Sequence, residues 1–333
     1  MGQVAHLPNF LAAPDCEVVA LAELRPRLRE LVAERYAIPR TVASHTELAE
    51  AEDIDAVVAI TPEDLNERIA CDLLSAGKPV MTEKPMAVSL AAARRMVEAG
   101  RAGDAHLMVG YMKRYDDGVR QAKRLIDRLR ESGELGEVTF ACGHCFCGGW
   151  QAGLGGHVTT DEEYPQLDRT PLPSWLPEEA SGDYRRFNNV FCHNVNLLRH
   201  LLSSPLAVKH VDMSGPTWMV LLDGGGFPIS LEMGKLDAHA WEEQTRVYFE
   251  RGWIEIETPS PLLRNVPATV TVYRGGEEPQ LRRPIAPWTW AFENEARHFL
   301  ECVREGKEPL SSGEDSIRDV ELIEAIARQG LGD

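Results

Sequence analysis

The sequence has few cysteines for its length and no long hydrophobic run. Its seven cysteines are an odd number in 333 residues, which favours reduced thiols and a cytoplasmic location. The longest apolar stretches, such as 56–60, are far too short to span a bilayer. Residues 1–10 lack the basic start and apolar run of a signal peptide. A membrane span and a disulfide scaffold are therefore not expected.

Positive charge is also scarce. Lys and Arg number 35 against 52 Asp and Glu, which gives a formal charge of −17. A surface this acidic repels nucleic acid and anionic lipid, so neither is expected as a partner. The remaining composition, 44% hydrophobic and 26% charged, is that of an ordinary globular protein, and the length suits two domains.

The first third of the chain alternates apolar strand patterns with amphipathic helix patterns. Continuous apolar strands separated by such helices indicate a parallel sheet covered on both faces. We therefore expect an α/β, Rossmann-type domain over residues 1–116. The expected strands are 17–22, 54–60, 79–82 and 106–110, and the expected helices are 25–36, 65–76 and 90–102.

The pattern changes after Tyr111. A linking helix at 117–131 is followed by strands in succession, which predict an open, mostly antiparallel sheet in an α+β substrate and oligomerisation domain over 117–333. The C-terminal helices are expected to pack back. The segment 148–181 shows no period, and a loop of that length is usually functional. The strands are expected at 138–146, 208–213, 218–222, 229–233, 245–249, 253–258 and 268–273, with helices at 183–202, 292–305 and 316–329.

A dinucleotide-binding fold needs a glycine turn after its first strand and an acid about 20 residues later. Glu23 follows the strand EVVALA and suits the acid, and Gly2 lies 21 residues before it, the spacing of the last glycine. The first strand and the earlier glycines are therefore missing or truncated. Two explanations stay open: a misassigned or shortened start, or a degenerate domain that binds cofactor poorly or not at all.

Five segments together resemble the glucose–fructose oxidoreductase and inositol dehydrogenase family (Gfo/Idh/MocA). This resemblance implies a Rossmann domain, a second domain with an open antiparallel sheet, and an active site between them. It also implies hydride transfer between NAD(P) and a sugar or cyclitol hydroxyl. The segments are MGQVAHLPNFLAAPDCEVVALAELRP, IDAVVAITPEDLNERIACDLLSAGKPVMTEKPMAVS, VGYMKRYDDGVRQAK, NVFCHNVNLLRHLL and AFENEARHFLECVREGKEPLSSGEDSIRDVELIEAI.

The resemblance also assigns site residues. Lys84 matches the lysine of the family's Glu-Lys-Pro motif and donates to the reacting oxygen, whereas His193 matches the general base. Pro85 matches a proline whose preceding bond is often cis. NAD is the expected cofactor because Glu23 disfavours a 2′-phosphate, although Arg25 and Arg27 are near enough to bind one, so NADP stays possible. The expected cofactor-binding residues are Gly2, Glu23, Arg25, Thr61, Pro62, Glu83, Lys84 and Pro85.

Two positions depart from the family pattern. The family often carries Asp where this chain has Asn189 and Asn196, four residues before and three after the histidine. Helical spacing places both on the face of His193, and Asn189 is expected to orient the imidazole or a substrate hydroxyl. Asparagine cannot stabilise imidazolium by charge, so proton transfer is slow, passes through Lys84, or uses an acid such as Asp183.

The remaining candidates concern substrate and metal. Lys113 and Arg114 are expected to bind substrate hydroxyls or an anionic group, with a structural ion pair as the alternative. Trp150 and Tyr184 flank the variable loop and are candidates to stack on a sugar ring, with a position in the core as the alternative, since large aromatic side chains are more often core residues. Three cysteines in a C-x-x-C-x-C pattern, Cys142, Cys145 and Cys147, lie on an alternating strand and do not converge, so no metal is expected.

The leading hypothesis is an NAD(P)-dependent oxidoreductase acting on a sugar, nucleotide-sugar or cyclitol hydroxyl. One alternative is a redox-assisted glycosidase or epimerase with retained cofactor. Another is a catalytically degenerate, cofactor-free paralogue that acts as a partner subunit. Strand 218–222 is apolar in both registers, which predicts a homodimer or homotetramer formed through the outer face of the C-terminal sheet.

Overall fold

The computed structural model describes residues 1–151 and 154–332, which form two compact units. The first unit comprises Met1–Gly110, Gly153–Ser174 and Glu295–Val320. The second comprises Tyr111–Ala152, Trp175–Asn294 and Glu321–Asp333. The segment 148–181, which the sequence left without an assigned structure, is thus divided between them, and most of it belongs to the first unit.

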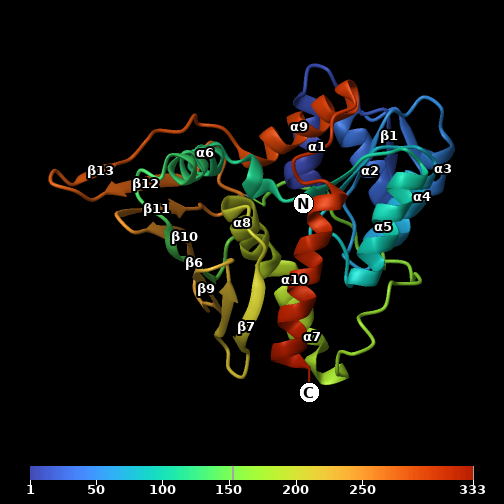
Figure 1. Ribbon diagram of the computed structural model, residues 1–333. Coiled ribbons are helices and arrows are strands. Elements are labelled where there is room, and N and C mark those ends of the chain that lie inside the picture. The colour runs from blue at the N-terminus through green and yellow to red at the C-terminus, as the bar shows by residue number, and fades with distance from the viewer. Residues whose placement is uncertain (152–153, 333) are drawn as a thin grey trace. The chain divides into compact units, whose positions relative to one another are not determined.

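The first unit contains two separate parallel ladders, β1–β2 and β3–β4–β5. Its strands are short and mostly apolar, and helices lie between them in the chain (Figure 1). This arrangement confirms the predicted Rossmann-type parallel sheet. The elements are η1 (Gly2–His6), α1 (Leu7–Ala12), β1 (Ala20–Ala22), α2 (Pro26–Tyr36), β2 (Arg40–Val42), α3 (His45–Glu50), β3 (Val57–Ala59), α4 (Asn66–Ser75), β4 (Val80–Glu83), α5 (Leu90–Ala102) and β5 (Leu107–Gly110).

The second unit contains an eight-stranded sheet in the order β13-β12-β11-β10-β6-β9-β8-β7. Its pairs are antiparallel except β6 with β9, which is parallel, so the predicted open, mostly antiparallel sheet is confirmed. The strands are β6 (Val138–Cys147), β7 (Ala207–Asp212), β8 (Trp218–Asp223), β9 (Pro228–Lys235), β10 (Trp241–Phe249), β11 (Gly252–Glu257), β12 (Thr269–Arg274) and β13 (Gln280–Arg282).

Two helices of the second unit, α6 (Asp117–Ser132) and α8 (Cys192–Leu202), pack on this sheet. Glycines allow both helices a close approach. A Cβ on Gly118 would lie 2.0 Å from the carbonyl oxygen of Ala268, and one on Gly143 would lie 3.0 Å from Leu231 and 3.3 Å from Leu198. Along β8, Val220 is buried while its neighbours Met219 and Leu221 are 56% and 40% exposed, so the strand presents apolar side chains to both faces.

The helix predicted over 183–202 forms as three pieces. They are α7 (Ser181–Arg186), a π-helical turn η4 (Phe187–Phe191) and α8. A π turn changes the rotation per residue and is frequent at functional sites. The sequence pattern did not assign the strands β2 and β13 or the helices η1, α1 and α3, which have three to six residues. The equally short strands β1 and β3 were assigned because each lies within a longer apolar run, 17–22 and 54–60. The remaining helices are η2 (Met112–Tyr115), η3 (Glu178–Ala180), α9 (Ala291–Glu305) and α10 (Gly313–Leu331).

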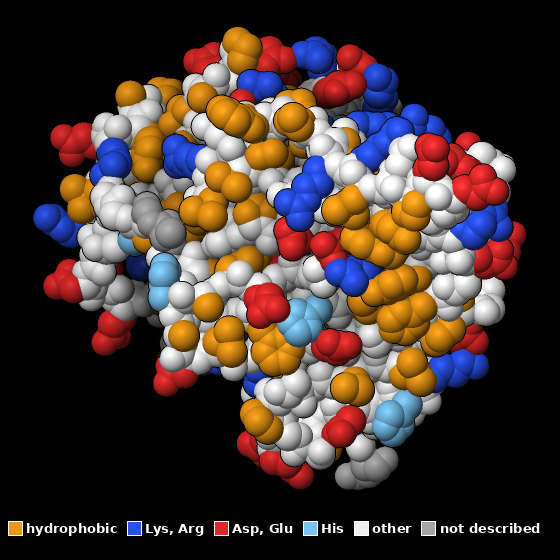
Figure 2. Space-filling view, turned by 90° about the vertical axis from the view of Figure 1, so that its left-hand side faces the viewer, with side chains coloured by type: hydrophobic (Ala, Val, Ile, Leu, Met, Phe, Trp, Pro, Cys, Tyr) orange, Lys and Arg blue, Asp and Glu red, His pale blue; other side chains and the backbone are white. Residues whose placement is uncertain are grey.

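Acidic and basic side chains are interspersed on the face drawn in Figure 2, with hydrophobic clusters among them. Although the formal charge of the chain is −17, basic side chains lie among the acidic ones on this face. Within the described part of the chain, a helix of the length and apolarity needed to cross a membrane is absent.

Candidate functional site

The turn after β4 carries the Glu-Lys-Pro motif, and its backbone is held by a buried asparagine. Asn66, at the start of α4, donates its side-chain amide to the carbonyl oxygens of Glu83 (3.2 Å) and Pro85 (3.0 Å). Thr61 donates to the other end of the same amide, at 2.7 Å. The Lys84–Pro85 peptide bond is cis. Lys84 therefore lies at the carboxyl end of a parallel strand, where α/β proteins bind ligands, on a turn with fixed geometry.

The Glu83 side chain turns inward from this motif. Its Oε1 lies 2.6 Å from Nε2 of His6, and its Oε2 accepts the backbone N–H of Lys84 at 3.1 Å. Burial raises the pKa of Glu83, but the hydrogen bond and charge of His6, together with the charge and backbone N–H of Lys84, outweigh burial and hold the pKa below its usual value. Glu83 is therefore ionised at neutral pH and positions the backbone of Lys84.

A second buried acid, Glu295, lies near Glu83. The side chain of Glu295 is fully buried, and neither carboxylate oxygen has a hydrogen-bond partner among the described residues. A Cβ on Gly110 would lie 3.7 Å from Oε1 of Glu295 and 3.5 Å from Cα of Glu83. Burial, reinforced by the charge of Glu83, raises the pKa of Glu295 well above its usual value. Glu295 thus lies behind the motif with its protonated form favoured by burial. Sequence reasoning missed it because its helix shows only an amphipathic pattern.

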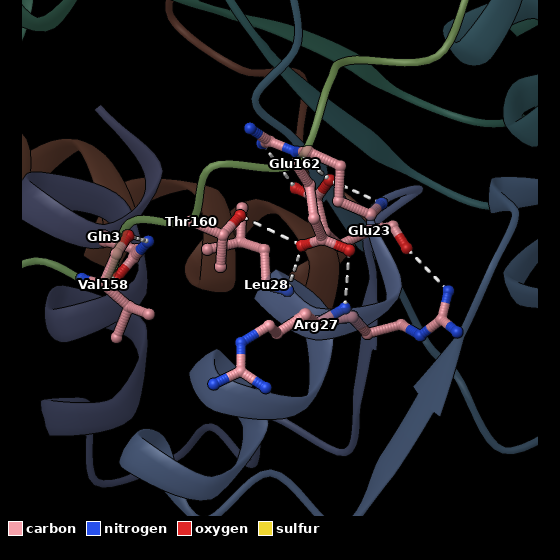
Figure 3. Close-up of polar contacts among 9 residues, drawn as sticks. Gln3, Glu23, Arg27, Leu28, Val158, Thr160 and Glu162 are labelled. Carbon is pink, nitrogen blue, oxygen red and sulfur yellow. Dashed lines mark hydrogen bonds and ion pairs between the residues drawn. The ribbon is translucent and has the colours of Figure 1, made fainter.

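The end of β1 carries the predicted ribose acid. Glu23 is bound by Arg25, whose Nε and Nη2 lie 2.9 and 3.2 Å from the two carboxylate oxygens, and whose backbone N–H donates at 3.0 Å. Figure 3 shows Glu23 beside the first turn of α2. The carboxylate is at the strand end where the fold binds an adenosine ribose, so Glu23 fits that half of NAD. Gly2 is less confined, since a Cβ there would make only ordinary contacts of 3.9 Å with Ile60.

The second unit brings three polar residues together. The Lys113 ammonium forms a buried ion pair with Oε1 of Glu243, and Asn194 donates its amide to the same oxygen at 2.8 Å. Lys113 also lies 5.7 Å from the ring centroid of Trp241. Neither Glu243 nor Asn194 was among the sequence candidates. Glu243 occupies an inward-facing position of the alternating strand β10, and an acid at such a position is the signal that could have found it.

The candidates around α8 have different surroundings. Arg114 donates from Nε to Oδ1 of Asn196 at 2.9 Å, and both residues are buried. The ring of His193 is part-buried and meets Tyr111 edge-on at 6.3 Å. Asn189, in the π turn, is exposed. The structure thus pairs Arg114 with Asn196, whereas Lys113 is paired with Glu243.

The two aromatic candidates also differ. Trp150 is part-buried and meets Trp241 at 6.5 Å. Tyr184 is almost fully buried and packs edge-on against Trp175 at 6.0 Å. In this structure Tyr184 thus packs as a core residue does, and its stacking on a sugar ring stays a prediction.

Among the described residues, none of the cysteines forms a disulfide. A hydrogen bond from Cys145 lowers the pKa of Cys147 to about 7, and the same bond, with burial, raises the pKa of Cys145. Among the residues that the structure describes, a group of three or more His, Cys, Asp or Glu side chains able to hold a metal ion is absent.

Comparison with known proteins supports the resemblance. Residues 1–111 match the oxidoreductase family with an NAD-binding Rossmann fold that includes glucose–fructose oxidoreductase and inositol dehydrogenase, which confirms the resemblance seen in the sequence. The similarity to individual relatives extends further. The inositol 2-dehydrogenase of Rhizobium meliloti (strain 1021) is 23% identical over 338 residues, 97% of this chain and 92% of the relative.

Another relative is the scyllo-inositol 2-dehydrogenase (NAD(+)) of Bacillus subtilis (strain 168), 23% identical over 95% of this chain and 87% of the relative. Solved structures share the fold. An aldose-aldose oxidoreductase from Caulobacter crescentus complexed with glycerol has a TM-score of 0.74 and 23% identity over 97% of this chain and 92% of its own. A 3-ketoreductase from Actinomadura kijaniata with NADP and TDP-benzene has a TM-score of 0.75 and 20% identity over 99% and 94%.

Proposed function

We propose that this protein is an NAD(P)-dependent oxidoreductase that transfers a hydride between the nicotinamide cofactor and a hydroxyl-bearing carbon of a sugar, nucleotide-sugar or cyclitol. The observation that carries the proposal is the Glu-Lys-Pro turn. Asn66 and Glu83 hold its backbone at the carboxyl end of β4, which fixes Lys84 at the ligand-binding edge of the sheet. The inositol dehydrogenases among the relatives support this reaction class.

Alcohol oxidation requires a hydride acceptor and a group that removes the hydroxyl proton. Bound NAD(P) supplies the hydride acceptor. In our proposal the ammonium of Lys84 donates a hydrogen bond to the reacting oxygen and stabilises its developing negative charge. His193 takes the proton, since an imidazole titrates near neutral pH. Asn189 is exposed, so its role in orienting the imidazole or a hydroxyl is proposed for the substrate-bound protein.

Substrate recognition is proposed for the second unit. Lys113, Arg114 and Asn196 are polar groups held by neighbours, and Glu243 has one carboxylate oxygen, Oε2, without a partner among the described residues. A polyol offers several hydroxyls that both donate and accept hydrogen bonds, so it matches a mixture of ammonium, guanidinium, amide and carboxylate. The odd number of cysteines, seven, supports action in the cytoplasm.

One observation favours a second candidate, a catalytically degenerate paralogue that acts as a partner subunit without cofactor. The parallel strands of the described residues form two ladders rather than one sheet. The redox-assisted glycosidase or epimerase differs from the leading proposal only in that the cofactor is regenerated within each turnover. It would show cofactor binding without net reduction.

Absorbance at the reduced-nicotinamide band separates these functions. The protein is incubated with NAD or NADP and a panel of aldoses, nucleotide-sugars and inositols, and substrate consumption is followed in parallel. Net reduction with at least one compound is expected. Substrate conversion without net reduction would indicate the redox-assisted reaction. Failure to bind either nucleotide in a direct titration would contradict both and favour the paralogue.

A further inference from the structure

A segment far away in the sequence crosses the nucleotide-binding edge of the first unit. We call residues 158–170 the strap. Its first residue is bound by Gln3, whose side-chain amide donates to the carbonyl oxygen of Val158 and accepts its N–H, both at 2.9 Å (Figure 3). Gln3 belongs to η1, the first helical turn of the chain. The strap is therefore joined to the helix that precedes β1.

The other end of the strap is bound near β3. Arg169 forms an ion pair with Asp64 at 2.6 Å, and the backbone N–H of Thr170 donates to the carbonyl oxygen of Asp64 at 2.8 Å. The Thr170 hydroxyl donates to Glu67 at 2.8 Å. Asp64 and Glu67 follow β3, so the strap runs from the first helix to the carboxyl end of the second ladder and is fixed at both ends.

Between these ends the strap places a carboxylate on the N-terminus of α2. Glu162 accepts the backbone N–H groups of Arg27 at 2.9 Å and Leu28 at 2.8 Å, one on each oxygen, and the hydroxyl of Thr160 at 3.0 Å (Figure 3). Desolvation raises the pKa of Glu162, but the two backbone hydrogen bonds outweigh it and lower the pKa below its usual value. An anion therefore already occupies the two amides that a helix N-terminus offers to a phosphate.

The nearest cation is engaged as well. Arg25 makes three hydrogen bonds to Glu23, and its guanidinium lies 5.4 Å from the ring centroid of the strap residue Tyr164. Arg29 donates to the carbonyl oxygen of Glu23 at 2.8 Å. A 2′-phosphate on an adenosine ribose is usually accepted by an arginine at this strand end. Here that arginine is neutralised by Glu23, and the adjacent helix amides are taken by Glu162.

We propose that Glu162 is a cofactor-selectivity residue: together with Glu23 it excludes the 2′-phosphate of NADP and makes this edge selective for NAD. The inference rests on the proposed function, since it requires that a nicotinamide dinucleotide binds here. A 2′-phosphate would meet two carboxylates, and like charges in close contact repel one another. The adenosine ribose of NAD carries hydroxyl groups instead, and these donate hydrogen bonds to a carboxylate.

The experiment compares two single variants of the whole protein by fluorescence titration with NADH and NADPH. Glu162→Gln removes the charge and keeps an oxygen that accepts a helix amide. Glu163→Gln is the matched control, because it removes the same charge from the next residue, which is exposed. We expect Glu162→Gln to tighten NADPH binding about tenfold or more, with a change in NADH binding under about threefold. The control should leave the NADPH/NADH affinity ratio within about threefold of wild type.

A second measurement distinguishes the effect of the Glu162 charge from the effect of its hydrogen bonds, which hold the strap on α2. Titration with adenosine 2′,5′-bisphosphate and with AMP probes the adenosine half alone. The wild type should bind AMP more tightly than adenosine 2′,5′-bisphosphate. The ratio of these two affinities should fall as salt is raised from about 0.05 to 0.5 M, because salt screens the repulsion between the carboxylates and the 2′-phosphate. In Glu162→Gln the ratio should change less with salt. If Glu162→Gln changed the affinities for NADPH and NADH by the same factor, or left both unchanged, the inference about Glu162 would be wrong while the proposed function would stand. A wild type that binds neither dinucleotide would overturn the proposed function and this inference with it.

Discussion

Glu83 Oε1 and His6 Nε2 lie 2.6 Å apart in the buried interior of the first unit, although 77 residues separate them in the chain. The contact joins the first helical turn to the Glu-Lys-Pro motif. Because Glu83 also accepts the N–H of Lys84, the stability of this contact bears on the position of the lysine. Removing the imidazole would leave a buried carboxylate without its partner, which is costly.

We therefore expect His6→Ala to lower the free energy of unfolding by about 3 kcal/mol, as measured by urea denaturation. His45→Ala is the control. His45 pairs with Asp72 at a similar distance of 2.8 Å, but that pair is exposed to solvent, and such pairs contribute at most about 1 kcal/mol. If both variants lost a similar amount of the free energy of unfolding, the buried His6–Glu83 contact would stabilise the protein no more than the exposed pair does.

Glu295 predicts a pH dependence of stability. Its folded-state pKa is raised well above the usual value, so the folded protein binds a proton that the unfolded chain releases. Stability is then lost as pH rises above the unfolded pKa of about 4.3, and it continues to fall until the folded pKa is passed. Glu295→Gln removes this loss. The variant should have a higher Tm than wild type at pH 8, and the difference should shrink toward pH 4.

The control for Glu295 is Glu52→Gln, at an exposed position of the same unit. Its Tm should follow that of wild type across the same pH range. A stabilisation by Glu295→Gln that grew toward acid pH would mean that the buried carboxyl is ionised rather than protonated in the folded protein.

The Lys113–Glu243 pair predicts strong coupling. Lys113→Met leaves Glu243 buried and charged with only Asn194 on its bonded oxygen, so we expect a loss of about 3–5 kcal/mol in the free energy of unfolding. Adding Glu243→Leu should recover at least half of that loss, because both charges are then gone. A double-mutant cycle in urea measures the coupling. Additive losses would mean that the two side chains do not depend on each other.

Lys84 and His193 are expected to carry the proton chemistry. Lys84→Ala and His193→Ala should each lower kcat by about 10²–10⁴-fold on a substrate found in the panel, and the double variant should lose less than the product. Asn189→Asp should raise the rate or the apparent pKa of the histidine if the base lacks charge support. Lys209→Ala and His210→Ala, exposed neighbours on β7, are controls of the same residue types. Near-wild-type turnover in both site variants would refute the assignment.

The exposed side chains of β8 predict self-association. Met219 and Leu221 face away from the buried Val220 and Leu222, so they need a cover that a second copy of the sheet can give. Light scattering should give a particle of two or four times 37.0 kDa. Met219→Lys with Leu221→Lys should reduce it to the monomer, whereas Leu281→Lys, at an exposed position of β13, should not. A monomeric wild type at micromolar concentration would contradict the prediction.

The sequence by itself determined the succession of elements. Apolar runs such as 54–60 and amphipathic runs such as 90–102 have a period because burial acts on every residue of a strand or on one face of a helix. The Glu-Lys-Pro motif and Glu23 were also readable, since each follows a strand end at a fixed spacing. These signals are local, and they were sufficient for the Rossmann-type unit and the antiparallel sheet.

Only the tertiary structure decided which distant side chains meet. His6 with Glu83, Lys113 with Glu243, and Glu162 with the amides of Arg27 and Leu28 join residues 77, 130 and 135 or 134 positions apart. Charged residues of this kind resemble solvated surface residues in a sequence, because their pairing energy depends on burial and distance rather than on neighbours in the chain. The strap has no period at all, and its position is set by individual hydrogen bonds to Gln3, α2 and Asp64 that folding alone brings into reach.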